Sequence, residues 1–365
     1  MEIRKINETM TSRERVRRTF EFEKTDRPPI GYDSNAAIDR KFREYLGVEK
    51  ESRETFYEAI GMDYRPIGAP YIGPALFPPA PEGKHRDPLE GFITRWVEHE
   101  TGGYWDFCDF PLKDADDEAF DNYPVPDPDH FDYEEAARRA RSYGGKYSLY
   151  LGNPGVPDII NSNGRIMGME DTLVHLICED EAALNLMKRR AESSLKIMER
   201  TLAACKGEID FIWLGEDLGT QIAPMISLEL YRKTIKPIQK EYTDLAKEYG
   251  LPVMIHTCGS SSWAYEDFIE IGVKCVDTLQ PEAVNMSPSY LLEHFGGRLN
   301  LRGCISTAGP LAYGTAEDVR KNCFDVLTLM KPYGGYHFAP THAIQDNSPV
   351  ENVFAMYQSV YDFCR

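Results

Sequence analysis

The chain has 365 residues, a length that one large α/β domain with insertions commonly reaches. Its 41 basic and 59 acidic residues leave a net charge of −18 at pH 7, so we expect no nucleic-acid partner, which would need a basic face. No apolar run reaches the roughly 18 residues of a membrane span, and the first residues contain no signal-peptide core, so we expect no membrane association and a cytoplasmic location.

Strands and helices alternate along the predicted chain. A capped helix over residues 11–23 comes first, followed by a short strand at Ile30-Gly31-Tyr32 and by helices near 36–46 and 51–60. The later strands are predicted at 147–151, 209–214, 252–257, 273–278, 299–305 and 335–340. The later helices are predicted at 133–143, 168–178, 181–205, 227–249 (with a break near Pro237), 262–271, 287–294, 315–331 and 350–362.

This alternation is typical of a parallel sheet, and the regular units after residue 205 favour closure into a (β/α)8 TIM barrel. No GxGxxG motif follows the first strand and no P-loop is present, so a dinucleotide-binding sheet has little support. We expect residues 1–365 to form one domain with a loop-rich insertion at about 65–130, a segment rich in Pro, Gly, aromatic and acidic residues. Its aromatic residues fit a donor pocket, a partner surface or ordinary packing: Tyr71, Phe77, Tyr104, Trp105 and Phe107.

Polar and sulfur-containing residues follow the predicted strands, at the ends where catalytic residues of such barrels lie. The strand Val253–Thr257 carries His256, and Cys258 two residues later points to the same face. Zinc binds Cys, His and carboxylate ligands, and a catalytic zinc keeps one position open for substrate. The candidates for a third ligand are His342, Cys304 and Glu216, although Glu216 also fits a helix cap and Cys304 also fits a buried packing thiol.

Four segments together resemble the uroporphyrinogen decarboxylase superfamily. They are Thr11-Ser12-Arg13-Glu14-Arg15-Val16, Trp213-Leu214-Gly215-Glu216-Asp217-Leu218-Gly219-Thr220-Gln221, His256-Thr257-Cys258-Gly259, and Gly334 to Gln345 followed by Glu351-Asn352. The resemblance spans nearly the whole chain and implies a (β/α)8 barrel with its site at the C-terminal rim. That superfamily contains haem-pathway decarboxylases and zinc-dependent corrinoid methyltransferases, among them methylcobamide:coenzyme M methyltransferases and the methyltransferase components of O-demethylase systems.

The residues at this rim resemble the methyltransferase branch more closely. His256 and Cys258 match its HxC pair, while His342 stands where coenzyme M-type enzymes have a third ligand, a cysteine. The decarboxylases also have a histidine at that position, but their arginine-rich segment is missing, since Tyr32-Asp33-Ser34-Asn35 follows the first strand. One thiolate instead of two would make zinc a stronger Lewis acid, which suits a donor oxygen at least as well as a thiol.

The resemblance therefore implies a zinc-dependent methyltransferase that moves a methyl group between a small methylated donor, such as a methoxylated aromatic, and a corrinoid protein. His256, Cys258 and His342 would hold zinc, with Glu216 or Cys304 as a further ligand. Glu216 and His342 are the expected catalytic residues, and the expected substrate-binding residues are Tyr32, Asp217, Gln221 and Gln345. The alternatives are a metal-free decarboxylase and a non-enzymatic barrel that binds a corrinoid or tetrapyrrole. An oligomer is compatible with the sequence.

Overall fold

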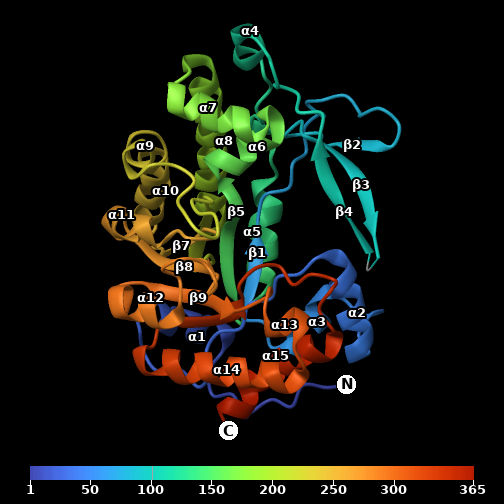
Figure 1. Ribbon diagram of the computed structural model, residues 1–365, viewed down its shortest axis with the longest axis vertical. Helices are drawn as coiled ribbons and strands as arrows, with labels where there is room; N and C mark the ends of the chain where they lie inside the picture. The colour runs from blue at the N-terminus through green and yellow to red at the C-terminus, as the bar shows by residue number, and fades with distance from the viewer. Residues whose placement is uncertain (101) are drawn as a thin grey trace.

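The computed structural model describes residues 1–100 and 102–365. Its main element is a curled sheet of seven parallel strands in the order β1-β5-β6-β7-β8-β9-β10 (Figure 1). These strands are β1 (Tyr64–Ile67), β5 (Ser148–Pro157), β6 (Phe211–Gly215), β7 (Val253–His256), β8 (Val273–Leu279), β9 (Asn300–Ile305) and β10 (Tyr336–Pro340). The strands β6, β9 and β10 are buried along their whole length, as expected for a parallel sheet that helices cover.

A short segment at residues 29–31 joins the two edges of this sheet. Gly31 N donates to Phe338 O at 2.8 Å, and Phe338 N donates to Pro29 O at 2.8 Å. On the other side, Asp63 N donates to Ile30 O at 3.0 Å, next to the start of β1. The segment therefore serves as the eighth strand between β10 and β1, and the predicted TIM-barrel fold is confirmed.

Helices surround the barrel, and neighbours in this outer layer pack on one another in chain order, α5 on α8, α8 on α10, α10 on α11, α12 on α14 and α14 on α15 (Figure 1). The longer helices are α1 (Ser12–Phe20), α2 (Ala36–Leu46), α3 (Arg53–Ile60), α5 (Tyr133–Ser142), α6 (Ile159–Met167), α7 (Met169–Cys178), α8 (Glu181–Cys205), α10 (Lys236–Glu248), α12 (Pro288–Phe295), α14 (Ala316–Met330) and α15 (Val350–Phe363). Shorter helical pieces are α4 (Asp117–Asp121), α9 (Leu228–Thr234), α11 (Tyr265–Ile271), α13 (Pro310–Tyr313), and the 3-10 turns η1 (Pro128–His130), η2 (Ser262–Ala264) and η3 (Lys331–Tyr333). None of the helices in the described ranges has both the length and the apolar character that crossing a bilayer requires.

Helix α6 is a difference from the sequence prediction, which placed no helix between the strand at 147–151 and the helix at 168–178. The strand β5 runs on to Pro157, and α6 follows at once, with the Asp158 side chain accepting a hydrogen bond from Asn161 N. Its sequence Ile-Ile-Asn-Ser-Asn-Gly-Arg-Ile-Met contains several poor helix formers. Burial of Ile159, Ile160, Ile166 and Met167 overrides this low propensity.

The segment 65–130, expected as an insertion, begins inside the barrel strand β1 and includes residue 101, which lies outside the described residues. It contains an antiparallel sheet of β2 (Lys84–Arg86), β3 (Ile93–His99) and β4 (Gly102–Cys108), which stands beside the barrel in Figure 1. Trp96 pairs with Trp105 across β3 and β4, and both side chains are about half exposed. At the far end of β3, His99 Nε2 lies 3.8 Å from the carboxylate of Asp346, in the loop after β10.

A buried ion cluster ties the N-terminal segment to the barrel. Arg15 in α1 and Arg27 each place a guanidinium nitrogen 2.6 Å from the carboxylate of Asp63, and all three side chains are almost fully buried. Asp63 also accepts a hydrogen bond from Ile30 N at 2.7 Å. Burial alone would raise the pKa of Asp63, but the two guanidinium groups lower it below its usual range. Asp63 therefore connects α1, the segment at residues 29–31 that closes the barrel, and β1.

The substitution Asp63→Asn is expected to destabilise the fold, because it leaves two buried guanidinium groups without their shared anion. Removing one partner of a buried ion pair costs about 3–5 kcal/mol, so the thermal unfolding midpoint should fall by several degrees. The control is Asp325→Asn, which breaks an exposed pair with Lys321 and should leave the midpoint unchanged. Equal midpoints for wild type and Asp63→Asn would contradict the role given to this cluster.

Candidate metal centre

A cavity of about 290 Å³ opens at the carboxyl ends of the barrel strands. It is lined by Asp33, Pro154, Gly155, Asp158, Asn161, Arg165, Trp213, Asp217, His256, Asp277, Thr278, Arg302, Pro340, His342 and Ala343. Several of them, namely Asp158, Asp217, His256, Pro340 and His342, lie at or just after the last residue of a strand, because parallel strands bring their carboxyl ends to one rim. The lining includes four aspartates, two arginines and two histidines.

Three side chains at this rim are close enough to share one metal ion. Ligand atoms of Asp217, His256 and Cys258 all lie within 4.8 Å of one another. The Cys258 sulfur is 3.3 Å from His256 Nε2, which in turn is 3.6 Å from Asp217 Oδ1. An ion that binds each ligand at about 2.0–2.3 Å fits between donor atoms at such separations. The thiol, imidazole and carboxylate are also the ligand types that zinc prefers.

The orientation of the His256 ring is set by its second nitrogen. His256 Nδ1 lies 3.2 Å from the Asp277 carboxylate and 2.6 Å from Thr278 Oγ1, both in the adjacent strand β8. Although burial alone would raise the pKa of Asp277, the Arg302 guanidinium and the hydrogen bond from His256 lower it to about 2. The ionised carboxylate accepts, so Nδ1 carries the proton and Nε2 faces Cys258 and Asp217. Metal-binding histidines commonly have such a carboxylate behind them.

Arg302 in β9 holds Asp277 in turn. It contacts the Asp277 carboxylate directly, and its other terminal nitrogen lies 2.5 Å from Asp33. Its guanidinium also packs over the Trp213 ring at 4.7 Å. Both Arg302 and Asp277 are almost fully buried, so the pair is screened little by water and fixes the carboxylate behind His256.

Asp217 has two further contacts that fix its position. Its Oδ1 accepts a hydrogen bond from Cys258 N at 2.7 Å, and its Oδ2 accepts one from Asn161 Nδ2 at 2.8 Å. Burial, together with the adjacent Asp217 carboxylate, raises the pKa of the Cys258 thiol. Without a bound cation Cys258 is therefore a neutral thiol. The sequence predicted that Asp217 binds substrate, whereas the geometry places its carboxylate beside His256 and Cys258 as a third candidate metal ligand.

Among the described residues, Glu216 and Cys304 are not part of the group of three candidate metal ligands. Glu216 is fully buried, and its two carboxylate oxygens accept hydrogen bonds from Ile159 N at 2.7 Å and Ile160 N at 2.9 Å. Burial, followed by the nearby Asp158, raises the pKa of Glu216 well above its usual value. The hydrogen bonds that Glu216 accepts from Ile159 N and Ile160 N cap the first turn of α6. Cys304 is fully buried in the core, as one of the sequence interpretations held.

His342 lines the same cavity, but its ring is more distant. Its centroid is 6.3 Å from that of His256, and the side chain is exposed. His342 is not part of the group of donors within 4.8 Å in the described residues. The roles that the sequence predicted for His342, as a ligand and as a catalytic residue, are untested, and the spacing of the ligand atoms favours Asp217 as the third ligand.

The other residues predicted to bind substrate are not among those that line the cavity. Tyr32 is buried and donates its hydroxyl to Asp39 at 3.0 Å. Gln221 is exposed in the loop after β6, and Gln345 is exposed and accepts a hydrogen bond from Asn35 at 3.3 Å. A role of these three side chains in substrate binding stays a prediction.

Sequence reasoning missed several residues of this cavity. The pairing of Asp277 with His256 depends on the register between β7 and β8, in which His256 lies opposite Asp277. Arg302 lies within β9, which is buried along its whole length, so a charged residue inside a buried strand was the available signal. Asn161 and Arg165 belong to α6, which the sequence did not predict.

The model of the family described as Uroporphyrinogen decarboxylase (URO-D) matches residues 161–363, which is more than half of the chain. The chain belongs to this family. The match includes strands β6 to β10 and therefore all three candidate metal ligands. A search of curated proteins gave no match.

A solved structure of a methyltransferase from Methanosarcina mazei has a similar shape. It aligns with a TM-score of 0.66 over 97% of this chain and 99% of that chain, at 15% sequence identity. At this identity the likeness shows a common fold, extending over both chains nearly from end to end.

Measuring the metal content of variants of this URO-D family member tests whether Asp217, His256 and Cys258 bind a metal ion. Cys258→Ala and Asp217→Asn are each expected to reduce zinc from about one ion per chain to a small fraction, because each removes one of the three clustered ligand atoms. His342→Ala should retain zinc. Elemental analysis after purification without chelator measures all three, with Cys178→Ser, at an exposed cysteine in α7, as the control. Loss of zinc in His342→Ala with retention in Asp217→Asn would make His342 the third ligand instead.

The substitution Asp277→Asn tests how the ring is held. The neutral amide can no longer attract the Nδ1 proton of His256 as an anion does, and Arg302 loses an ionic partner. Changes behind a metal ligand typically weaken metal binding about 10- to 100-fold, and competition with a chromophoric chelator will measure this. Asp244→Asn, in an exposed pair with Lys240, should bind zinc like wild type, and the same affinity in Asp277→Asn would contradict the proposed orientation.

Proposed function

We propose that this protein is a zinc-dependent methyltransferase that moves a methyl group between a small methylated donor and a corrinoid carried by a partner protein. The observation that carries the proposal is the group of Asp217, His256 and Cys258 at an open cavity on the rim of a URO-D family barrel. The structural similarity to a methyltransferase over nearly the whole chain supports it.

The donor group fits zinc by its chemistry and its spacing. One sulfur, one imidazole nitrogen and one carboxylate oxygen converge, and the cavity beside them leaves a fourth position for a donor. When bound there, zinc supplies Lewis-acid polarisation of the oxygen, nitrogen or sulfur that the methyl group leaves. The chain itself holds the ligands in position. Asp277 orients the ring of His256, and Cys258 N donates a hydrogen bond to the Asp217 carboxylate.

The cavity is suited to a small molecule. Its volume of about 290 Å³ is close to the lower end of ligand pockets, which start at about 300 Å³. Its walls combine the flat Trp213 ring with polar groups from α6, β7, β8, β9 and the loops beside them. A methylated donor bound here would have its reactive atom beside the ligands, and binding in one orientation lowers the entropic part of the barrier.

The same cavity argues against a decarboxylase acting on a tetrapyrrole with many carboxylates. Four aspartates line it, namely Asp33, Asp158, Asp217 and Asp277. One of its two arginines, Arg302, is already paired with Asp33 and Asp277. A polyanionic substrate would meet like charges here, whereas a small donor has to meet only one part of the wall.

Methylation of cob(I)alamin tests this function. The purified protein with zinc is incubated anaerobically with cob(I)alamin and a panel of methoxylated aromatics, methanol, methylamines and methyl thiols, and the absorbance change on methylation is followed. We expect turnover with at least one class of donor and a loss of at least about 100-fold in Cys258→Ala, since polarisation by the metal is worth several kcal/mol. Cys178→Ser should be as active as wild type, and undiminished activity in Cys258→Ala would remove zinc chemistry from the account.

A further inference from the structure

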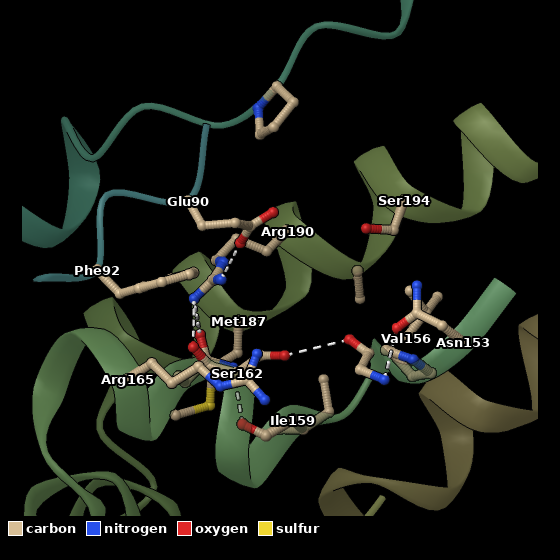
Figure 2. A pocket seen from close by; sticks show the side chains of 15 residues that line it. Glu90, Phe92, Asn153, Val156, Ile159, Ser162, Arg165, Met187, Arg190 and Ser194 are labelled. Atoms are coloured by element: carbon tan, nitrogen blue, oxygen red, sulfur yellow. Dashed lines mark hydrogen bonds and ion pairs between the residues drawn. The ribbon is translucent and has the colours of Figure 1, made fainter. Parts of the chain in front are cut away.

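Arg165 in α6 lies where three neighbouring cavities meet. It lines the cavity beside the candidate metal ligands, called the metal cavity below. It also lines a second, polar cavity of about 230 Å³, shown in Figure 2, and a third cavity of about 330 Å³. Gly155 also lines both the metal cavity and the second cavity. The Arg165 side chain is half-buried, so its guanidinium is partly shielded from bulk water. A molecule that enters the metal cavity therefore meets this cation at its wall.

The other arginines of these cavities are already engaged. Arg302 pairs with Asp277 and Asp33. Arg190 contacts Glu90, as Figure 2 shows, and donates to Asn163 Oδ1 at 2.9 Å. Their charges are balanced within the protein, so neither is available to a ligand.

Arg165 differs from both. Within the described residues its guanidinium has no hydrogen bond or ion pair, and it packs over the Phe107 ring, with the guanidinium carbon 5.3 Å from the ring centroid. Burial, followed by the nearby Asp217 carboxylate, raises the pKa of Asp158, and Arg165 offsets only part of that rise. The Asp158 carboxylate accepts a hydrogen bond from Asn161 N at 3.1 Å and, among the described residues, forms no ion pair with Arg165. Five N–H donors on a half-buried cation are thus left for water or a ligand.

The unmatched guanidinium identifies the kind of ligand that fits. A guanidinium presents two parallel N–H groups that match the two oxygens of a carboxylate, and such a bidentate pair is stronger than a neutral hydrogen bond. The Phe107 ring beneath it restricts the guanidinium plane, which reduces the entropy lost on binding. The ligands of the metal centre line the same cavity as Arg165, so one small molecule can contact both.

We propose that Arg165 determines donor specificity by binding a carboxylate of the methyl donor, while the donor's methylated atom lies beside His256 and Cys258. This inference rests on the proposed function and narrows its substrate class to small methylated acids, of which methoxybenzoates are the simplest aromatic form. Arg165 acts in binding and orientation only, and the methyl transfer itself does not involve it.

Calorimetric titration without any corrinoid tests this inference. Zinc-loaded wild-type protein is titrated with 2-, 3- and 4-methoxybenzoate and with the corresponding uncharged methoxybenzyl alcohols. We expect at least one acid to bind at least 10-fold more tightly than its alcohol. In Arg165→Gln this preference should disappear, with the acid binding at least 10-fold more weakly and the alcohol unchanged. Arg165→Lys should restore part of the preference, because it restores the charge without the planar fork.

The matched control is Arg139→Gln, at an exposed arginine in α5, which should keep the wild-type preference. Thermal unfolding and zinc content verify that each variant is folded and loaded. Equal binding of acid and alcohol by wild type, no binding of either, or an unchanged preference in Arg165→Gln would each overturn the inference.

Failure of the proposed function has a different signature. Acids that bind through Arg165 but never methylate cob(I)alamin would support the anion site and contradict the methyltransferase. Methyl transfer from uncharged donors at a rate that Arg165→Gln leaves unaltered would support the methyltransferase and overturn the specificity role of Arg165.

Discussion

The buried chain of contacts from Arg302 through Asp277 to His256 is the interaction on which the candidate site depends. A charged pair inside a protein is costly to bury unless both groups are well bonded. Here Arg302 has two carboxylates and a tryptophan ring, and Asp277 has the guanidinium and the imidazole. Because each group satisfies the next, the ring of His256 is held in one orientation and one tautomer. The nitrogen that faces the cavity is therefore fixed before any ligand arrives.

A second constraint comes from Glu216, whose carboxylate is bonded to the first amides of α6. This contact joins the loop after β6 to the start of α6, and α6 brings Asn161 and Arg165 to the cavity. Asn161 in turn bonds to Asp217, the residue after Glu216. Two adjacent acidic residues thus have separate tasks, since one positions a helix and the other lies in the donor group.

Charge balance explains why so acidic a cavity can exist at the barrel mouth. Asp33 and Asp277 share Arg302, and Asp217 lies where a divalent cation fits between a thiol and an imidazole. In the proposed function that cation offsets the remaining negative charge, and Arg165 is left to meet an anionic donor. The arrangement separates two positive centres within one cavity, which would orient a donor that carries a carboxylate at one end and a methyl group at the other.

The sequence itself determined the order of the barrel strands and most of the helices, and it identified His256 and Cys258, two residues apart, as a candidate ligand pair. Apolar runs of four to six residues between amphipathic helices permit few folds, and side chains two apart on a strand point the same way. The tertiary structure alone decided that Asp217 lies beside His256 and Cys258 as a third candidate ligand, that Asp277 and Arg302 stand behind His256, and that His342 lies farther off. These contacts join residues far apart in the chain, and they depend on strand register and on the closing segment at residues 29–31. Helix α6 was likewise decided by burial, since its own residues favour a helix only weakly.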